Sequence, residues 1–136
     1  MDIKKLAVAA TTTLHLRDSN DDPLYNDAAK TQPVTVTLYG PGSKQYAAAS
    51  ARQNNRMLDK LKRKGKTEQT PEQIAVEKAE FLADCTETFT NLEYGVLTGA
   101  ALAKAVYADL TIGFIADQVS RHLGDWANFS TPSTTT

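Results

Sequence analysis

The sequence is poor in the residues that build covalent cross-links, metal centres and membrane spans. Its 136 residues include one cysteine, Cys85, which excludes an intramolecular disulfide and a cysteine pair for zinc. The two histidines, His15 and His122, are far apart and belong to no HExxH motif. No apolar run approaches the roughly 18 to 20 residues that cross a bilayer, so we expect no membrane partner. These absences favour a cytosolic protein.

The usual sequence motifs of catalysis are also missing. The chain has neither the GxxxxGK[ST] phosphate loop nor the GxGxxG dinucleotide motif. Cys85 falls on the apolar face of a predicted helix with no neighbouring histidine as a base, so we predict a core residue rather than a nucleophile. Carboxylates at helical spacing, such as Glu77 and Glu80, lack a second set of metal ligands. We therefore expect an interaction module that is not an enzyme, with no catalytic residues, no cofactor and no metal.

One junction organises the chain. Residues 34–39 alternate between apolar and polar side chains (VTVTLY), which is typical of a half-buried β-strand. The following Gly40-Pro41-Gly42 interrupts strand pairing, because proline has no N–H to donate and glycine accepts backbone angles closed to other residues. Ser43 is placed to cap a helix over residues 44–64. The sequence therefore predicts a change from β-structure to helix at this point.

Further elements on both sides of the junction are predicted. Residues 12–17 alternate in the same way, so we expect them to pair antiparallel with residues 34–39 across a long surface loop. Thr70-Pro71-Glu72-Gln73 is a capping-box sequence that starts a second helix, whose apolar face extends to Phe89. An Ala-rich third helix follows, and a fourth helix ends at Gly124.

These elements predict a single α+β domain over residues 1–129. A small N-terminal antiparallel sheet, a hairpin over about residues 11–39, precedes a bundle of about four α-helices over about residues 43–124. Residues 130–136 are rich in Ser and Thr and lack apolar side chains. We expect these last residues to be a disordered tail.

Charge is distributed unevenly along the chain, although the formal net charge is only −1. Basic residues predominate between positions 52 and 66, and acidic residues predominate between positions 68 and 125. This pattern favours a head-to-tail contact between copies, and it is equally consistent with an ordinary solvated surface. The candidate self-association residues are Arg56, Lys60, Lys62, Arg63, Lys64, Asp84, Glu87 and Asp117.

Several segments of the sequence are similar to one protein family. They are residues 35–46 (TVTLYGPGSKQY), residues 81–86 (FLADCT), residues 113–119 (GFIADQV) and residues 127–130 (ANFS). In their order and spacing, over about residues 3–130, they resemble the tail assembly chaperones of long-tailed, non-contractile, lambda-like bacteriophages.

The resemblance implies a protein of phage tail morphogenesis that binds the tape measure protein, keeps this long apolar chain soluble and helps to recruit the tail tube protein. It also implies action in the host cell cytoplasm and absence from the mature virion. Coating an extended polymer needs self-association that does not close at a dimer, as in a spiral, ring or filament. The candidate client-binding residues are Phe114, Ile115, Trp126 and Phe129, although the same side chains are equally expected in the core.

A small nucleic-acid-binding regulator is the alternative. It would use the basic helix end at residues 56–66. No aromatic residue that could stack on bases lies between Arg52 and Lys66, and basic residues near a helix C-terminus also complement the helix dipole. Protein is therefore more expected than nucleic acid as the partner. Phosphate binding would weaken steeply with salt, whereas apolar burial would not.

Overall fold

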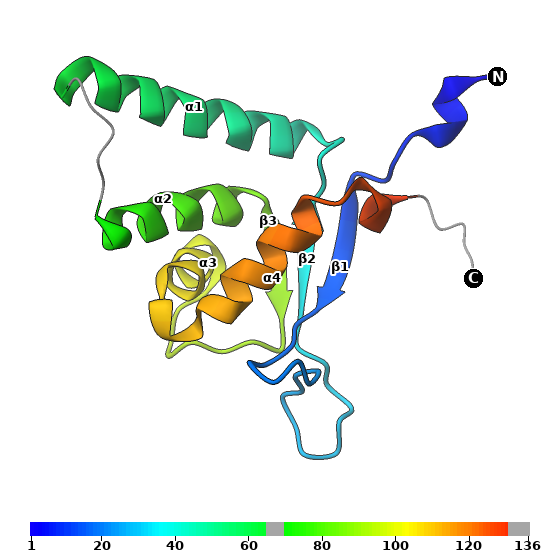
Figure 1. The fold of residues 1–136 in the computed structure, drawn as a ribbon. Coiled ribbons are helices and arrows are strands. Elements are labelled where there is room, and N and C mark those ends of the chain that lie inside the picture. The colour runs from blue at the N-terminus through cyan, green and yellow to red at the C-terminus, as the bar shows by residue number, and fades with distance from the viewer. Residues whose placement is uncertain (65–69, 131–136) are drawn as a thin grey trace.

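The computed structural model describes residues 1–64 and 70–130, without the side chains of Arg63 and Lys64. Within these residues the fold is α+β, as the sequence predicted, with one antiparallel sheet and four α-helices (Figure 1). The predicted disordered tail falls outside the description except for Ser130. The strands are β1 (Thr11–His15), β2 (Thr35–Tyr39) and β3 (Thr86–Thr90), and the helices are α1 (Lys44–Lys64), α2 (Pro71–Asp84), α3 (Gly99–Ala108) and α4 (Gly113–Leu123), with 3-10 turns η1 (Ile3–Leu6), η2 (Leu110–Ile112) and η3 (Trp126–Phe129).

The sheet has the order β1-β2-β3, with β2 in the middle and antiparallel to both neighbours. The predicted pairing of β1 with β2 is confirmed, and it places Leu14 opposite Val36. Alternation buries Val36 and Leu38 completely on one face, while a hydroxyl pair between Thr13 and Thr37 lies on the other. The half-buried strand read from the sequence is therefore the centre of the sheet.

The third strand is the main correction to the predicted fold. We expected the apolar face of the second helix to continue to Phe89, but α2 ends at Asp84 and Phe89 lies on β3. The five residues of β3 read TETFT, and β-branched threonine suits a pleated strand better than a helix interior. The second edge of β2 supplies the hydrogen-bond partners. The sheet is therefore not confined to the N-terminal part of the chain.

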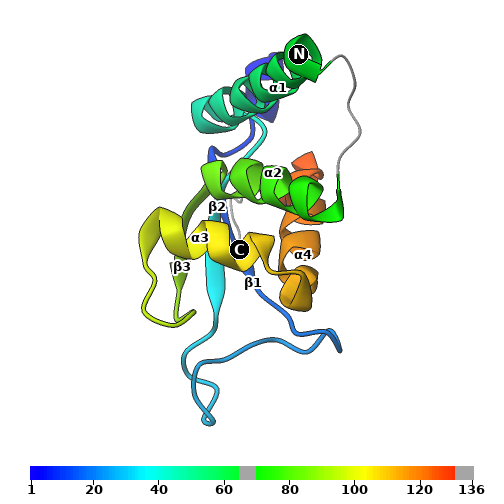
Figure 2. The ribbon, with the colours of Figure 1, turned by 90° about the vertical axis from the view of Figure 1, so that its left-hand side faces the viewer.

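Three helices cover one face of the sheet. Figures 1 and 2 show α2, α3 and α4 grouped against it. In this layer α3 lies on the side of the loop that follows β3. The core lies between the sheet and these helices. Its most enclosed large side chains are Leu16, Val36, Leu38, Leu82, Val106, Val119 and Phe129, with Cys85 among them.

Helix α1 contributes little to this core. It runs along the edge of the molecule beside α2, far from the sheet for most of its length (Figures 1 and 2). Its start is fixed as predicted, because the Ser43 hydroxyl accepts a hydrogen bond from the Tyr46 N–H and donates one to the Gly40 carbonyl. Only Ala49 of its described side chains is fully buried. Tyr46 also meets Phe81 of α2 edge to face, with ring centroids 5.6 Å apart.

The end of the described chain returns to the β2–α1 junction. The Phe129 ring, only 1% exposed, lies where a Cβ on Gly40 would fall 2.3 Å from a ring carbon. The Phe129 carbonyl also accepts a hydrogen bond from the Ala9 N–H. Glycine is therefore needed at position 40 for space, in addition to its role in ending the strand.

Candidate protein-binding surfaces

A ladder of ion pairs joins α1 to α2. Three basic side chains on one side of α1 meet three carboxylates on α2, and the spacing of about one turn on each helix brings successive pairs into line. Most of these side chains are partly exposed, so each pair contributes roughly 0 to 1 kcal/mol. The pairs are Arg52 with Asp84 at 3.1 Å, Arg56 with Glu80 at 3.5 Å, and Lys60 with Glu77.

A groove of about 490 Å³ lies between the same two helices. Arg56 and Lys60 line its α1 wall, and Val76 with neighbouring carboxylates lines its α2 wall. The Nε and Nη2 atoms of Arg56 are enclosed there without a hydrogen-bond partner among the described residues. The guanidinium therefore contacts Glu80 without the two-pronged geometry that makes arginine pairs strong.

The ladder changes the interpretation of the predicted self-association residues. Arg56, Lys60 and Asp84 already have partners within the chain, and Asp117 of α4 pairs with Lys78 of α2 at 3.1 Å. These four side chains are thus matched by opposite charges within one copy, and a head-to-tail contact through them would compete with these ion pairs. Of the remaining candidates, Lys62 and Glu87 are exposed, and the side chains of Arg63 and Lys64 lie outside the description.

The four predicted client-binding residues differ in their burial. Ile115 is 3% exposed and Phe129 is 1% exposed, so both belong to the core and the expectation that they contact a client is corrected. Their burial follows from helical spacing on α4 and from the close approach of Phe129 to Gly40. Phe114 is partly buried against the core. Trp126 is 58% exposed and remains available to a partner.

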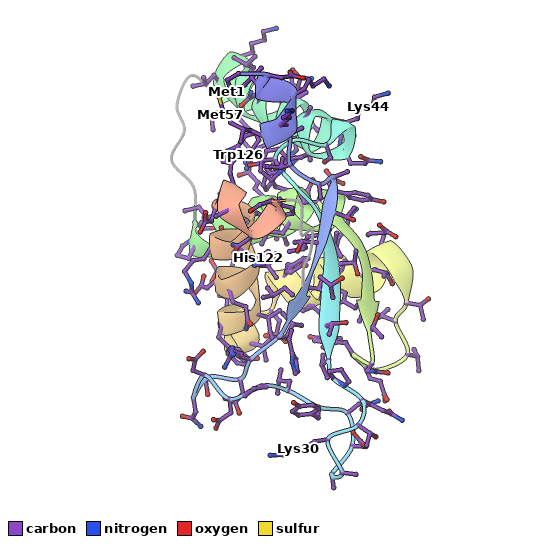
Figure 3. The ribbon with its side chains drawn as sticks, turned by 90° about the vertical axis from the view of Figure 1, so that its right-hand side faces the viewer. Met1, Lys30, Lys44, Met57, His122 and Trp126 are labelled. Carbon is purple, nitrogen blue, oxygen red and sulfur yellow. The ribbon has the colours of Figure 1, made fainter. Side chains whose placement is uncertain are left out.

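Several large apolar side chains on α1 and α2 that were not among the predicted client-binding residues are exposed. Met57 and Leu58 are each 53% exposed and Leu61 is 41% exposed, although α1 is otherwise polar. On α2, Ile74 is 51% exposed. Figure 3 shows Met57 and Trp126 on the side of the molecule where α4 lies. The sequence signal for this surface was a group of large apolar residues on a helix whose face toward α2 is charged.

Cys85 and Tyr107 are buried, and each packs within the core. Burial raises the pKa of the Cys85 thiol to about 12, with the Asp84 charge adding to the effect, so the thiol stays protonated at neutral pH. Burial also raises the pKa of Tyr107, whose hydroxyl lies 2.7 Å from the Thr86 hydroxyl. The prediction that Cys85 is a core residue is confirmed.

His122 is likewise held in a packed setting. Its ring meets Phe129 with centroids 5.6 Å apart, and partial burial lowers its pKa, with Asp125 opposing the effect. Its Nε2 atom is enclosed without a hydrogen-bond partner among the described residues. The imidazole is therefore favoured in its neutral form and supports η3 through contact with Phe129.

Metal sites and membrane spans are two further classes of site to consider. Across residues 1–64 and 70–130, no group of three or more His, Cys, Asp or Glu side chains is arranged to hold a metal ion. In the same part of the chain no single helix is long and apolar enough to cross a membrane, and only the pair at Gly99–Ala108 and Leu110–Leu123, bent by 79°, passes by length and composition together.

Comparison with known proteins gives no further identification. The chain matches no protein-family model, no curated protein and no solved structure.

Proposed function

We propose that this protein is a tail assembly chaperone of a long-tailed, non-contractile phage. It binds the tape measure protein in the host cell cytoplasm, keeps that chain soluble, helps to recruit the tail tube protein and is absent from the mature virion. The observation that carries the proposal is the set of large apolar side chains left exposed on the surface, including Trp126 and Ile74. Exposed apolar groups of this size suit a long apolar helical client.

The positions of the resembling segments support the proposal. Residues 35–46 contain Gly40, and residues 127–130 contain the Phe129 ring that packs against it. Residues 81–86 form the end of α2 and the start of β3, which is paired with β2. Segments far apart in the sequence thus form one continuous structural unit, which is the behaviour expected if their order and spacing are features of a shared fold.

The nucleic-acid alternative is weakened by the ladder between α1 and α2. Arg56 and Lys60 would have to supply phosphate contacts, but both already meet carboxylates on α2. Opposite charges this close reduce the positive potential that attracts a phosphate backbone. A protein client is therefore the better supported partner.

Co-expression with the tape measure protein of the same phage tests the proposal. We expect the wild-type chain to raise the soluble fraction of the tape measure protein, because exposed apolar surface on both chains becomes covered. Trp126→Ala should reduce this gain, since it removes the most exposed aromatic side chain. The readout is the ratio of soluble to pelleted tape measure protein.

Val96→Ala is the matched control for that experiment. Val96 is 96% exposed in the loop before α3, so its replacement also removes exposed apolar surface without affecting packing. This variant should keep the full gain in solubility. No gain from the wild-type chain would reject the chaperone proposal, and equal losses from both variants would reject the role of Trp126.

A further inference from the structure

One face of α1 is exposed and graded by side-chain size. Seven residues lie on this face at helical spacing, of which six are exposed and Ser50 is partly buried. Small side chains occupy the half near the start of the helix, and large apolar ones occupy the half near its end. In chain order the residues are Ala47, Ser50, Ala51, Asn54, Met57, Leu58 and Leu61.

The rest of the fold holds this face outward. The ion pairs made by Arg52, Arg56 and Lys60, together with buried Ala49, occupy the opposite side of α1. In Figures 1 and 2 the side of α1 away from α2 has no other described element alongside it. A face that one copy leaves open in this way is accessible to a second copy.

We propose that α1 pairs antiparallel with α1 of a second copy, around a two-fold axis that passes through Asn54. In this register the half of each helix with large side chains meets the half of the other helix with small side chains. The two-fold axis repeats this contact on both sides of Asn54. The positions in each pair add up to twice 54. The pairs are Met57 with Ala51, Leu58 with Ser50, Leu61 with Ala47, and Asn54 with its own copy.

The size gradient selects the antiparallel orientation. Large side chains opposite small ones allow two helices to approach closely and interlock along their length. A parallel pair would set Met57, Leu58 and Leu61 against the same side chains, and would set Ala47 against alanine with a gap between them. Antiparallel alignment also places the positive end of each helix dipole beside the negative end of the other.

Asn54 fixes the register at the centre of the pair. Its amide both donates and accepts hydrogen bonds, so two Asn54 side chains related by the two-fold axis can bond to each other. A slip of one helical turn toward the large half would leave each amide facing Leu58, and a slip in the other direction would separate the two amides and pair each with Ser50. A single polar residue in such a seam is known to specify alignment. The match of a central polar residue with graded apolar flanks points to a second copy rather than to an unrelated helix.

The expected dimer is weak and depends on protein concentration. A single strip along one helix is smaller than the area of about 1,200 to 2,000 Å² that stable interfaces bury. The contact is independent of the proposed function, because no client takes part in it. It closes at a dimer, so any open-ended assembly on a client needs a separate contact.

Cross-linking of the full-length chain tests the axis. In Asn54→Cys the new thiols face each other across the two-fold axis, and a short bismaleimide should join them in a yield that rises with protein concentration. Native Cys85 is fully buried and should give little background. Asn55→Cys is the matched control, since position 55 lies about 100° further round the helix.

Two further variants test the register and the apolar contact. A mixture of Ala51→Cys and Met57→Cys chains should cross-link to each other more than either does to itself. Leu58→Glu should shift the sedimentation mass of the folded protein toward monomer. Equal cross-linking of Asn54→Cys and Asn55→Cys, or a wild-type mass that stays monomeric at every concentration while circular dichroism shows intact helices, would overturn the proposal.

Discussion

At the scale of single residues, the contact between Gly40 and Phe129 ties the end of the described chain to the β2–α1 junction. The ring occupies the space that any Cβ at position 40 would need. Phe129 is also among the largest fully buried side chains. Gly40 therefore has two roles, because it follows the central strand directly and leaves the space in which the Phe129 ring packs.

Substitution at this contact should show strong coupling. Gly40→Ala should lower the free energy of unfolding by about 1 to 3 kcal/mol, because the added methyl group overpacks the ring. Phe129→Ala should cost about 3 to 5 kcal/mol by leaving a cavity. In the double variant the methyl group has room, so urea unfolding should give a loss smaller than the sum of the two single losses. Additive losses would show that the ring does not limit position 40.

Sequence reasoning at this scale succeeded where the physical cause is local. The caps at Ser43 and Thr70 depend on hydrogen bonds to residues three positions away, and both form as predicted. Trp126 and Phe129 could not be separated in this way. Both are aromatic residues of η3, and the buried one, Phe129, packs against Gly40, which is distant in the sequence.

At the scale of elements, α1 is joined to the body by apolar contact near its start, at Tyr46 and Ala49, and by charge further along. Its inner face carries the ion pairs to α2, whereas α2, α3 and α4 share an apolar core. Exposed ion pairs are weak compared with apolar burial. We therefore expect α1 to open more readily than the rest of the fold.

Hydrogen exchange can measure this difference directly. The triple variant Arg52→Ala, Arg56→Ala and Lys60→Ala should exchange its α1 amides faster than the wild type, with exchange in α3 and α4 unchanged. Alanine favours helix more than the residues it replaces, so faster exchange would report lost docking rather than lower helix propensity. Lys104→Ala, at an exposed site on α3, is the control. Unchanged exchange in α1 would show that the ladder does not hold the helix.

The elements that sequence reasoning misjudged depend on distant partners. Residues 86–90 resemble the end of an apolar helix face when read alone, and they form β3 because β2 has a second free edge. The charge pattern was equally consistent with contact between copies and with a solvated surface, and the structure shows basic side chains of α1 paired with carboxylates of α2 in the same chain. Local periodicity contains no information about either partner.

At the scale of the whole molecule, the surface combines balanced charge with scattered large apolar side chains. The ladder matches basic and acidic residues between two helices, while Ile74 and Trp126 remain exposed. Such a surface is better suited to bury an apolar partner than to attract a phosphate backbone. The central claim is therefore that the client is bound mainly by apolar contact.

The salt resistance of the client complex tests this claim most directly. The tagged protein is co-expressed with the tape measure protein of the same phage, treated with nuclease, and passed through a size-exclusion column at low salt and at about 1 M salt, where charge interactions are screened beyond about 3 Å. We predict that the two proteins elute together at both salt concentrations. Separate elution at low salt, or a complex that holds nucleic acid and falls apart at high salt, would contradict the account.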